Sequence, residues 1–291
     1  LTLPVQMLLT FIAGAAYPLA FAPFHLWPLT FASAAVLFWL LSRAEGRMPL
    51  IAWVFGLGKY AVGVSWIYVS IHQYGGASPL LAGIMVAVFV AFMALFCLPI
   101  GWFLGKLEAS KQNVSKTVLA MGFVATWVLM EWMLTWFLTG FPWLFAGHAM
   151  LGTPLQGYAP IVGNLGISLV VLTITVAVML SVDQAQPWKM RLAMAGVAVV
   201  LAGLGVSLDR QVWTKPTGRY EAALVQGNID QAIKWDADQR LNNVRKHMQL
   251  SEDHWDTDIL IWPEFALTLY GQDAVAVTDL LNRRGEFSQT I

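Results

Sequence analysis

The stretch that decides the fold class begins Pro79-Leu80-Leu81-Ala82-Gly83-Ile84 and runs to Gly105 without a charged residue. A helix needs roughly 20 apolar residues to cross the hydrocarbon of a bilayer. Residues 79 to 105 exceed that length, so this stretch predicts a membrane-spanning helix.

Six further apolar runs flank this stretch, at about 3 to 22, 26 to 42, 49 to 71, 116 to 138, 158 to 182 and 192 to 208. The whole chain of 291 residues is 58% hydrophobic and 12% charged, whereas an ordinary soluble domain has roughly 25% charged residues. We therefore expect an α-helical integral membrane bundle of about seven transmembrane helices over residues 1–209. The first two runs leave open a second reading, as shorter re-entrant helices.

Positive charges alternate between the connections of the apolar runs. Lys and Arg follow the second, fourth and sixth runs and are absent after the first, third and fifth; they are Arg43, Arg47, Lys106, Lys111, Lys116, Lys189 and Arg191. Cytoplasmic loops carry the excess of such residues. The pattern predicts a cytoplasmic amino terminus and an outer, non-cytoplasmic location for everything after Asp209.

Two charged residues lie inside the apolar runs, Lys59 and Glu131. A charge in hydrocarbon is costly, so each side chain should face the helix interior or a wet cavity. The residues fit equally a structural pair, a hydrogen bond to backbone, or a role at a substrate site. Phe141 and Trp143 lie in the fifth connection, where they either contact lipid or the outer domain, or act as plain aromatic anchors.

The last 82 residues have the composition of a water-soluble domain, with nine cations and twelve acids. Residues 210–219 read as a linker. Residues 220–227 predict a strand, 237–253 a helix, 258–264 a second strand, 273–284 a second helix, and 288–291 the opening of a third strand. A strand-helix-strand-helix order is typical of an α/β layer with parallel strands. An α/β layer normally needs more than two or three strands to bury its sheet on both faces. We therefore expect residues 220–291 to be the incomplete start of an α/β layer.

Glu264 follows the second of these strands, in Ile259-Leu260-Ile261-Trp262-Pro263-Glu264. Proline ends the strand and places the carboxylate at its carboxyl end, where catalytic groups of α/β layers collect. The alternative is a solvated loop acid.

Several blocks in order along the whole chain resemble one family. They are Ala20-Phe21-Ala22-Pro23-Phe24 with Trp27-Pro28, Ser65 to Ser70, Glu131, Leu138 to Trp143, Leu155 to Ile161, Val225 to Ile229, Lys234-Trp235-Asp236 and Trp262-Pro263-Glu264. Together they resemble apolipoprotein N-acyltransferases, the last enzymes of bacterial lipoprotein maturation.

The resemblance implies a bundle in the bacterial inner membrane that carries a periplasmic nitrilase-like domain with a Glu-Lys-Cys triad. In that family the cysteine takes an acyl chain from a phospholipid as a thioester and passes it to the α-amino group of a diacylglyceryl-cysteine on an apolipoprotein. Glu264 matches the general base, and Trp235 lies in a loop similar to the mobile arm over the active site. No Lys or Cys follows Glu264, so we expect the 291 residues to be inactive alone.

Other readings remain open. A non-catalytic membrane scaffold that binds lipid or lipoprotein would keep the same blocks, and a transporter would use Lys59 and Glu131 as a translocation pair. The single cysteine, Cys97, excludes an internal disulfide and fits a small buried hydrophobe. Nothing in the sequence indicates a metal, a cofactor or nucleic acid, and we expect a monomer in the lipid bilayer.

Overall fold

The structure, a computed structural model, describes residues 1–44, 46–110, 114–269 and 271–288. The chain divides into two compact units, Leu1–Trp213 and Thr214–Ile291. Lys111, which entered the charge pattern, lies outside the described residues.

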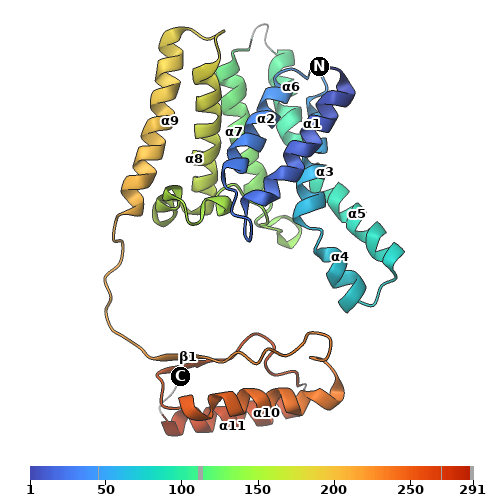
Figure 1. Cartoon of the computed structure of the whole chain (residues 1–291), viewed down its shortest axis with the longest axis vertical. Coiled ribbons are helices and arrows are strands. Elements are labelled where there is room, and N and C mark those ends of the chain that lie inside the picture. The colour runs from blue at the N-terminus through green and yellow to red at the C-terminus, as the bar shows by residue number, and fades with distance from the viewer. Residues whose placement is uncertain (45, 111–113, 270, 289–291) are drawn as a thin grey trace. The chain divides into compact units, whose positions relative to one another are not determined.

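The first unit is helical throughout (Figure 1). Proline stands in the first turn of α1, α2, α3, α5 and α8, where its missing N–H costs no hydrogen bond. The helices of this unit are α1 (Leu3–Ala16), α2 (Pro28–Leu41), α3 (Met48–Gly63), α4 (Ile67–Val69), α5 (Pro79–Leu95), α6 (Leu98–Ser110), α7 (Lys116–Met133), α8 (Ala159–Val182) and α9 (Trp188–Asp209).

Fewer helices pass a test of membrane-spanning length and composition than the seven predicted. Among the described residues four stretches pass, at Leu3–Ala20, Pro79–Ser110, Pro154–Val182 and Trp188–Asp209. A fifth is added if α3 and the following Ile67–Tyr74, bent by 58°, count as one span. Of the first two runs, only α2 is a shorter apolar helix, with 14 residues, and its reading as a re-entrant helix stays a prediction. Helix α7 includes the charged residues Lys116 and Glu131, which lower its hydropathy.

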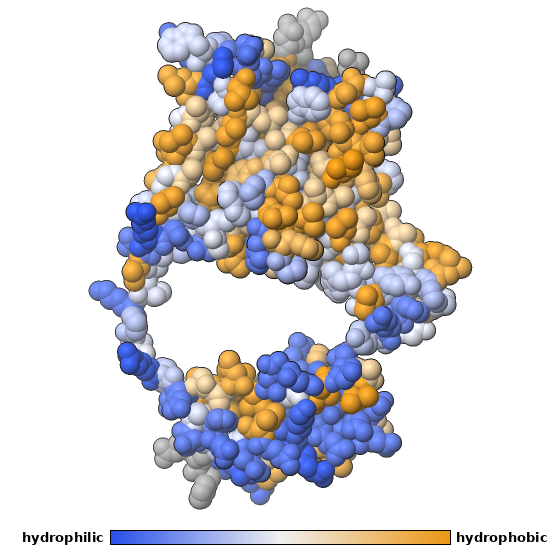
Figure 2. Space-filling view, in the orientation of Figure 1, coloured by the Kyte–Doolittle hydropathy of each residue, from blue (hydrophilic) through white to orange (hydrophobic). Residues whose placement is uncertain are grey.

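Large apolar side chains cover the outside of the helical unit (Figure 2). Leu80 and Val88 on α5 are 76% and 63% exposed, and Leu192 and Val199 on α9 are 66% and 71% exposed. Soluble monomers rarely expose so much contiguous apolar surface. The exposed face of these helices is therefore suited to lipid, and the protein is a membrane protein.

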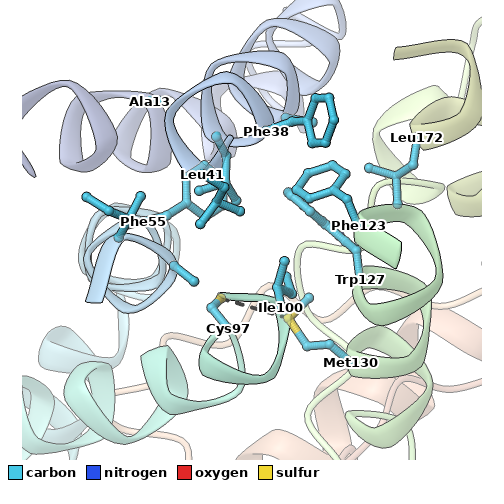
Figure 3. Close-up of a cluster of buried hydrophobic side chains, with 14 of the residues drawn as sticks. Ala13, Phe38, Leu41, Phe55, Cys97, Ile100, Phe123, Trp127, Met130 and Leu172 are labelled. Carbon is cyan, nitrogen blue, oxygen red and sulfur yellow. Dashed lines mark hydrogen bonds between the residues drawn. The ribbon is translucent and has the colours of Figure 1, made fainter. Parts of the chain in front are cut away.

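Aromatic rings fill the centre of the bundle. Phe55 of α3 lies 5.6 Å from Trp127 of α7, ring centroid to centroid, and Phe123 packs on the same indole at 5.5 Å. Figure 3 shows these rings beside Cys97, whose sulfur lies 3.8 Å from that of Met130. Cys97 is 1% exposed, which confirms its reading as a buried residue.

Helices α1 and α3 approach each other backbone to backbone. A methyl group on Gly58 would meet the carbonyl oxygen of Phe11 and come within 2.8 Å of the backbone nitrogen of Ala15. A methyl group on Gly14 would meet the carbonyl of Phe55. Small residues permit such close helix packing in membranes, so this crossing depends on both glycines.

The second unit holds β1 (Ala222–Leu224), α10 (Arg240–Ser251), β2 (Ile259–Ile261) and α11 (Gln272–Ser288). The two strands pair in parallel, with Ala223 opposite Leu260, which confirms the predicted strand-helix-strand order. Both strands are shorter than predicted. Residues 211–221 have no regular secondary structure where a linker was expected.

The expected third strand is wrong at Ser288, because α11 continues to that residue. No proline interrupts residues 272 to 288, so the helix has no strong stop signal. Residues 289–291, the remainder of that prediction, lie outside the described residues.

Candidate functional site

Glu264 lies just past the carboxyl end of β2, as Pro263 ends the strand. Its side chain is exposed. The next residue, Phe265, has φ of 57°, a left-handed backbone that a bulky residue adopts only under strain. Strained turns of this kind cluster at functional sites, whereas an exposed carboxylate is also what a solvated loop acid would show, so the catalytic role of Glu264 stays a prediction.

The loop before α10 reaches this turn. The Trp235 ring lies 5.7 Å from the Phe265 ring, and the Lys234 ammonium lies 3.4 Å from the backbone oxygen of Glu264. Asn243 of α10 donates from Nδ2 to the Lys234 carbonyl at 3.0 Å and so holds the loop. The structure thus brings together Trp235 and Glu264, 29 residues apart in the sequence.

The sequence did not mark Lys234 or Phe265 as a site residue, although Lys234 stands in one of the blocks that carry the resemblance. Lys234 also lies over the Phe265 ring, with Nζ 5.7 Å from the centroid. Its position next to Trp235 was the only signal. Phe265 gave none, because a left-handed backbone cannot be read from a phenylalanine.

A network of hydrogen bonds and a ring contact holds Trp262, the residue that follows β2. Trp262 donates from Nε1 to Ser251 Oγ at 2.8 Å, and Ser251 donates to the His247 carbonyl at 2.8 Å. The His247 ring lies 5.4 Å from the Trp262 ring. Gly227 allows this arrangement, because a methyl group there would lie 2.7 Å from the imidazole Nε2. The network anchors Trp262 beneath the turn that carries Glu264.

Glu131 lies at a different place, inside the helical unit, and is fully buried. Its Oε1 accepts one hydrogen bond from Trp127 Nε1 at 3.0 Å and another from the Ala146 backbone N–H at 2.8 Å. Gly147, the next residue, donates to Ser168 Oγ at 2.8 Å. The carboxylate therefore ties the loop after α7 to the centre of the bundle.

Lys59 is also fully buried. Its Nζ lies 4.8 Å from the centroid of the Tyr17 ring, 5.4 Å from that of Tyr60 and 5.7 Å from that of Trp127. Cation–π attraction stabilises an ammonium in such a cage. Lys59 and Glu131 form no ion pair at 4.0 Å or less, unlike Lys116 and Asp183, whose charged atoms lie 2.6 Å apart.

The loop after α7 lines a groove of about 520 Å³ with residues of other helices. Trp143 is 45% exposed and packs on Trp66, with ring centroids 5.8 Å apart. Phe141 is partly buried and packs edge-on against Phe89 of α5 at 5.5 Å. The groove lining is Pro18, Leu19, Phe21, Ala22, Phe24, Val62, Gly63, Trp66, Pro142, Trp143, Leu144 and His148.

The groove is mainly apolar and suits an apolar ligand. Trp143 belongs to its wall, whereas Phe141 supports Trp143 from the side, at 5.9 Å between rings. Sequence reasoning missed the contribution of Pro18 and Phe24, because their distance from Trp143 in the chain gives no signal. A search of the described residues finds no group of three or more His, Cys, Asp or Glu side chains that would hold a metal.

Comparisons with known proteins agree on one family. The model of the apolipoprotein N-acyltransferase N-terminal domain matches residues 13–177. The chain is 36% identical over 294 residues to the apolipoprotein N-acyltransferase of Coxiella burnetii, covering 98% of this chain and 59% of that protein. The enzyme of the same name from Pseudomonas putida is 38% identical over 279 residues, covering 95% and 55%.

The chain spans about half the length of these curated relatives, at 59% and 55% of the two proteins. The family match nevertheless covers more than half of the chain and includes α3, α7 and the groove-lining loop. The chain belongs to the apolipoprotein N-acyltransferase family.

Proposed function

We propose that the protein transfers a fatty acyl chain from a phospholipid to the α-amino group of the diacylglyceryl-cysteine of apolipoproteins. Family membership supports this function, and the strained strand end that carries Glu264 supports a catalytic group at that place. The observation that carries the proposal is the meeting of Trp235, Phe265 and Glu264 at one edge of the small sheet.

The proposed chemistry has two steps through a cysteine thioester. Glu264 accepts the thiol proton, and the thiolate attacks the ester carbonyl of the phospholipid. The ester bond breaks, the lysophospholipid oxygen takes a proton, and the acyl chain remains on sulfur. The α-amino group of the acceptor then attacks the thioester, loses a proton, and leaves an amide and the free thiol.

The proposal takes the nucleophile to be a cysteine other than Cys97. The 291 residues contain one cysteine, the buried Cys97, so the thioester requires a cysteine outside them. Likewise no Lys follows Glu264 to stabilise the oxyanion. These residues alone should therefore form no acyl-enzyme.

We assign roles in substrate or lipid binding to Trp235 in the outer unit, and to Trp143, Phe141 and Glu131 in the helical unit. Trp143 would touch an acyl chain in the groove, while Phe141 and Glu131 hold the groove wall. Residues 1–209 form the membrane bundle with about seven crossings, 210–219 a linker and 220–291 the start of a nitrilase-like domain. We place the bundle in the bacterial inner membrane with a cytoplasmic amino terminus, as a monomer.

The orientation has a direct test. A reporter enzyme that functions only in the periplasm should be active when it is fused after Asp209. The reason is that the connections with Arg43, Lys106 and Lys189 are proposed to be cytoplasmic, which puts Asp209 on the periplasmic side. A reporter that requires the cytoplasm, fused at the same residue, is the matched control. Activity of the cytoplasmic reporter would contradict the proposed topology.

The activity is tested with protein from the complete reading frame, purified and supplied with a phospholipid that carries a labelled acyl chain and with a diacylglyceryl-cysteine peptide. The proposal predicts labelled amide on the peptide and a labelled thioester on the protein when the peptide is omitted. The competing function is a scaffold that binds lipid or lipoprotein without chemistry. Binding of the peptide with no label transferred would support that scaffold.

A further inference from the structure

Four buried polar groups in the centre of the bundle have no hydrogen-bond partner among the described residues. They are the ammonium of Lys59, the hydroxyls of Tyr17 and Tyr60, and the Oε2 atom of Glu131. All four side chains are fully buried. An aromatic cage attracts the charge of Lys59 but accepts no conventional hydrogen bond from its three N–H groups, and such groups are costly to leave unpaired in an apolar interior.

The four groups complement one another. An ammonium only donates, a carboxylate only accepts, and a phenol does both. Tyr17 directly follows α1, Lys59 and Tyr60 lie on α3, and Glu131 lies on α7. Lys59 and Glu131 interact electrostatically, yet lie beyond the 4.0 Å of a direct ion pair. Their chemistry suits a small polar molecule that pairs with both.

We propose that ordered water occupies this place and bridges Lys59 Nζ to Glu131 Oε2, with the hydroxyls of Tyr17 and Tyr60 as further partners. Buried water satisfies about three hydrogen bonds where protein groups cannot pair directly. The four groups in one region provide that number, and the Ser168 hydroxyl interacts with the same carboxylate. This water-bridged ion pair is independent of acyl transfer, so it holds whether or not the proposed function does.

The bridge makes Glu131 a positioning residue for the groove. Its Oε1 holds the backbone N–H of Ala146, two residues beyond the groove residue Leu144. Leu144 has φ of 59° and packs on Gly63 of α3, where a methyl group would collide with its side chain. The carboxylate therefore holds the loop on α3 in a strained conformation, and the water on its other oxygen orients that carboxylate.

The first experiment detects the water. Hydroxyl radicals produced by X-ray pulses oxidise side chains that contact bound water, so protein from the complete reading frame, in lipid nanodiscs, is irradiated and digested. Tyr158 is the matched control, since it is 8% exposed and its hydroxyl donates to the Leu201 carbonyl at 2.8 Å. Tyr17 and Tyr60 should oxidise faster than Tyr158 although they are less exposed. Rates at or below that of Tyr158 would overturn the proposal.

The second experiment tests the positioning role by hydrogen exchange of the Ala146 amide, read with two double variants. Lys59→Met with Glu131→Gln keeps an acceptor for Ala146 and removes both charges, whereas Lys59→Met with Glu131→Leu removes the acceptor as well. The Leu variant should exchange about tenfold faster at Ala146 than the Gln variant. Equal exchange in the two variants would refute the role of Glu131. Thr126→Val on the same helix is the control, because the Thr126 hydroxyl bonds only within α7, to Gly122 and Phe123.

Discussion

Replacing Gly58 by alanine should destabilise the helical unit, whereas the same change at Gly83 should not. Gly58 of α3 faces the backbone of α1, and its new methyl group would meet the Phe11 carbonyl and the Ala15 nitrogen. Gly83 of α5 has no atom within 4 Å of the position where a methyl group would lie. The two variants add the same atoms to helices of the same unit, so they differ only in the space available.

The magnitude follows from these contacts. Because backbone atoms cannot rotate away, α1 and α3 must separate, and overpacking of this kind costs about 3 kcal/mol at the upper end of its usual range. Alanine also gains about 1 kcal/mol over glycine in a helix. Gly58→Ala should therefore lose about 2 kcal/mol and Gly83→Ala should gain up to about 1 kcal/mol. At about 2–4 °C per kcal/mol, the two melting temperatures should differ by roughly 6–12 °C.

Cys97 provides the assay. It is the single cysteine of the 291 residues and is 1% exposed, so a thiol-reactive fluorogenic dye reports the temperature at which the bundle opens. Purified chain in detergent is heated with the dye, and the variants are compared with the unaltered chain. Equal melting temperatures for Gly58→Ala and Gly83→Ala would refute the close backbone crossing of α1 and α3.

Two further predictions concern other parts of the chain. Gly227→Ala should destabilise the outer unit by about 1–3 kcal/mol, because its methyl group meets the His247 ring; thermal unfolding should show no such loss for Gly218→Ala, whose nearest contact is at 3.8 Å. At the other end, the hydrogen bond from Lys116, 2.6 Å away, holds the pKa of Asp183 below its ordinary value. A lowered carboxyl pKa stabilises the fold above about pH 3.9, and this stability is lost as the pH falls through the folded pKa. Because Lys116 is 45% exposed, the pair should contribute less than about 1 kcal/mol to the free energy of unfolding. Asp183→Asn should reduce the loss of stability at low pH. The same loss of stability in the variant and the unaltered chain would contradict the pairing.

The sequence predicted the parts of the fold that depend on local pattern. Each apolar run became one or two helices, since a chain in hydrocarbon must satisfy its backbone internally. Glu264 was placed after its strand, because Pro263 is a local stop signal. The run at 49–71 shows the limit, since it is continuous in the sequence yet bends by 58° after Gly63.

The connections between distant elements could not be predicted. Ala146 follows Glu131 by 15 residues and returns to it only because the loop folds back over the end of α7. The cage around Lys59 takes its rings from three places in the chain, and no spacing in the sequence encodes that meeting. The strained turn at Phe265 is likewise fixed by its neighbours, not by its own preference.

We propose Glu264 as the base of an acyl-transferring site. Protein from the complete reading frame, unaltered and with Glu264→Gln, is incubated in membranes with a phospholipid carrying a labelled acyl chain, and label bound as thioester is measured. The unaltered protein should accumulate labelled thioester, and the Gln variant should insert into the membrane equally well and accumulate none. Labelled thioester persisting in the Gln variant would contradict the role assigned to Glu264.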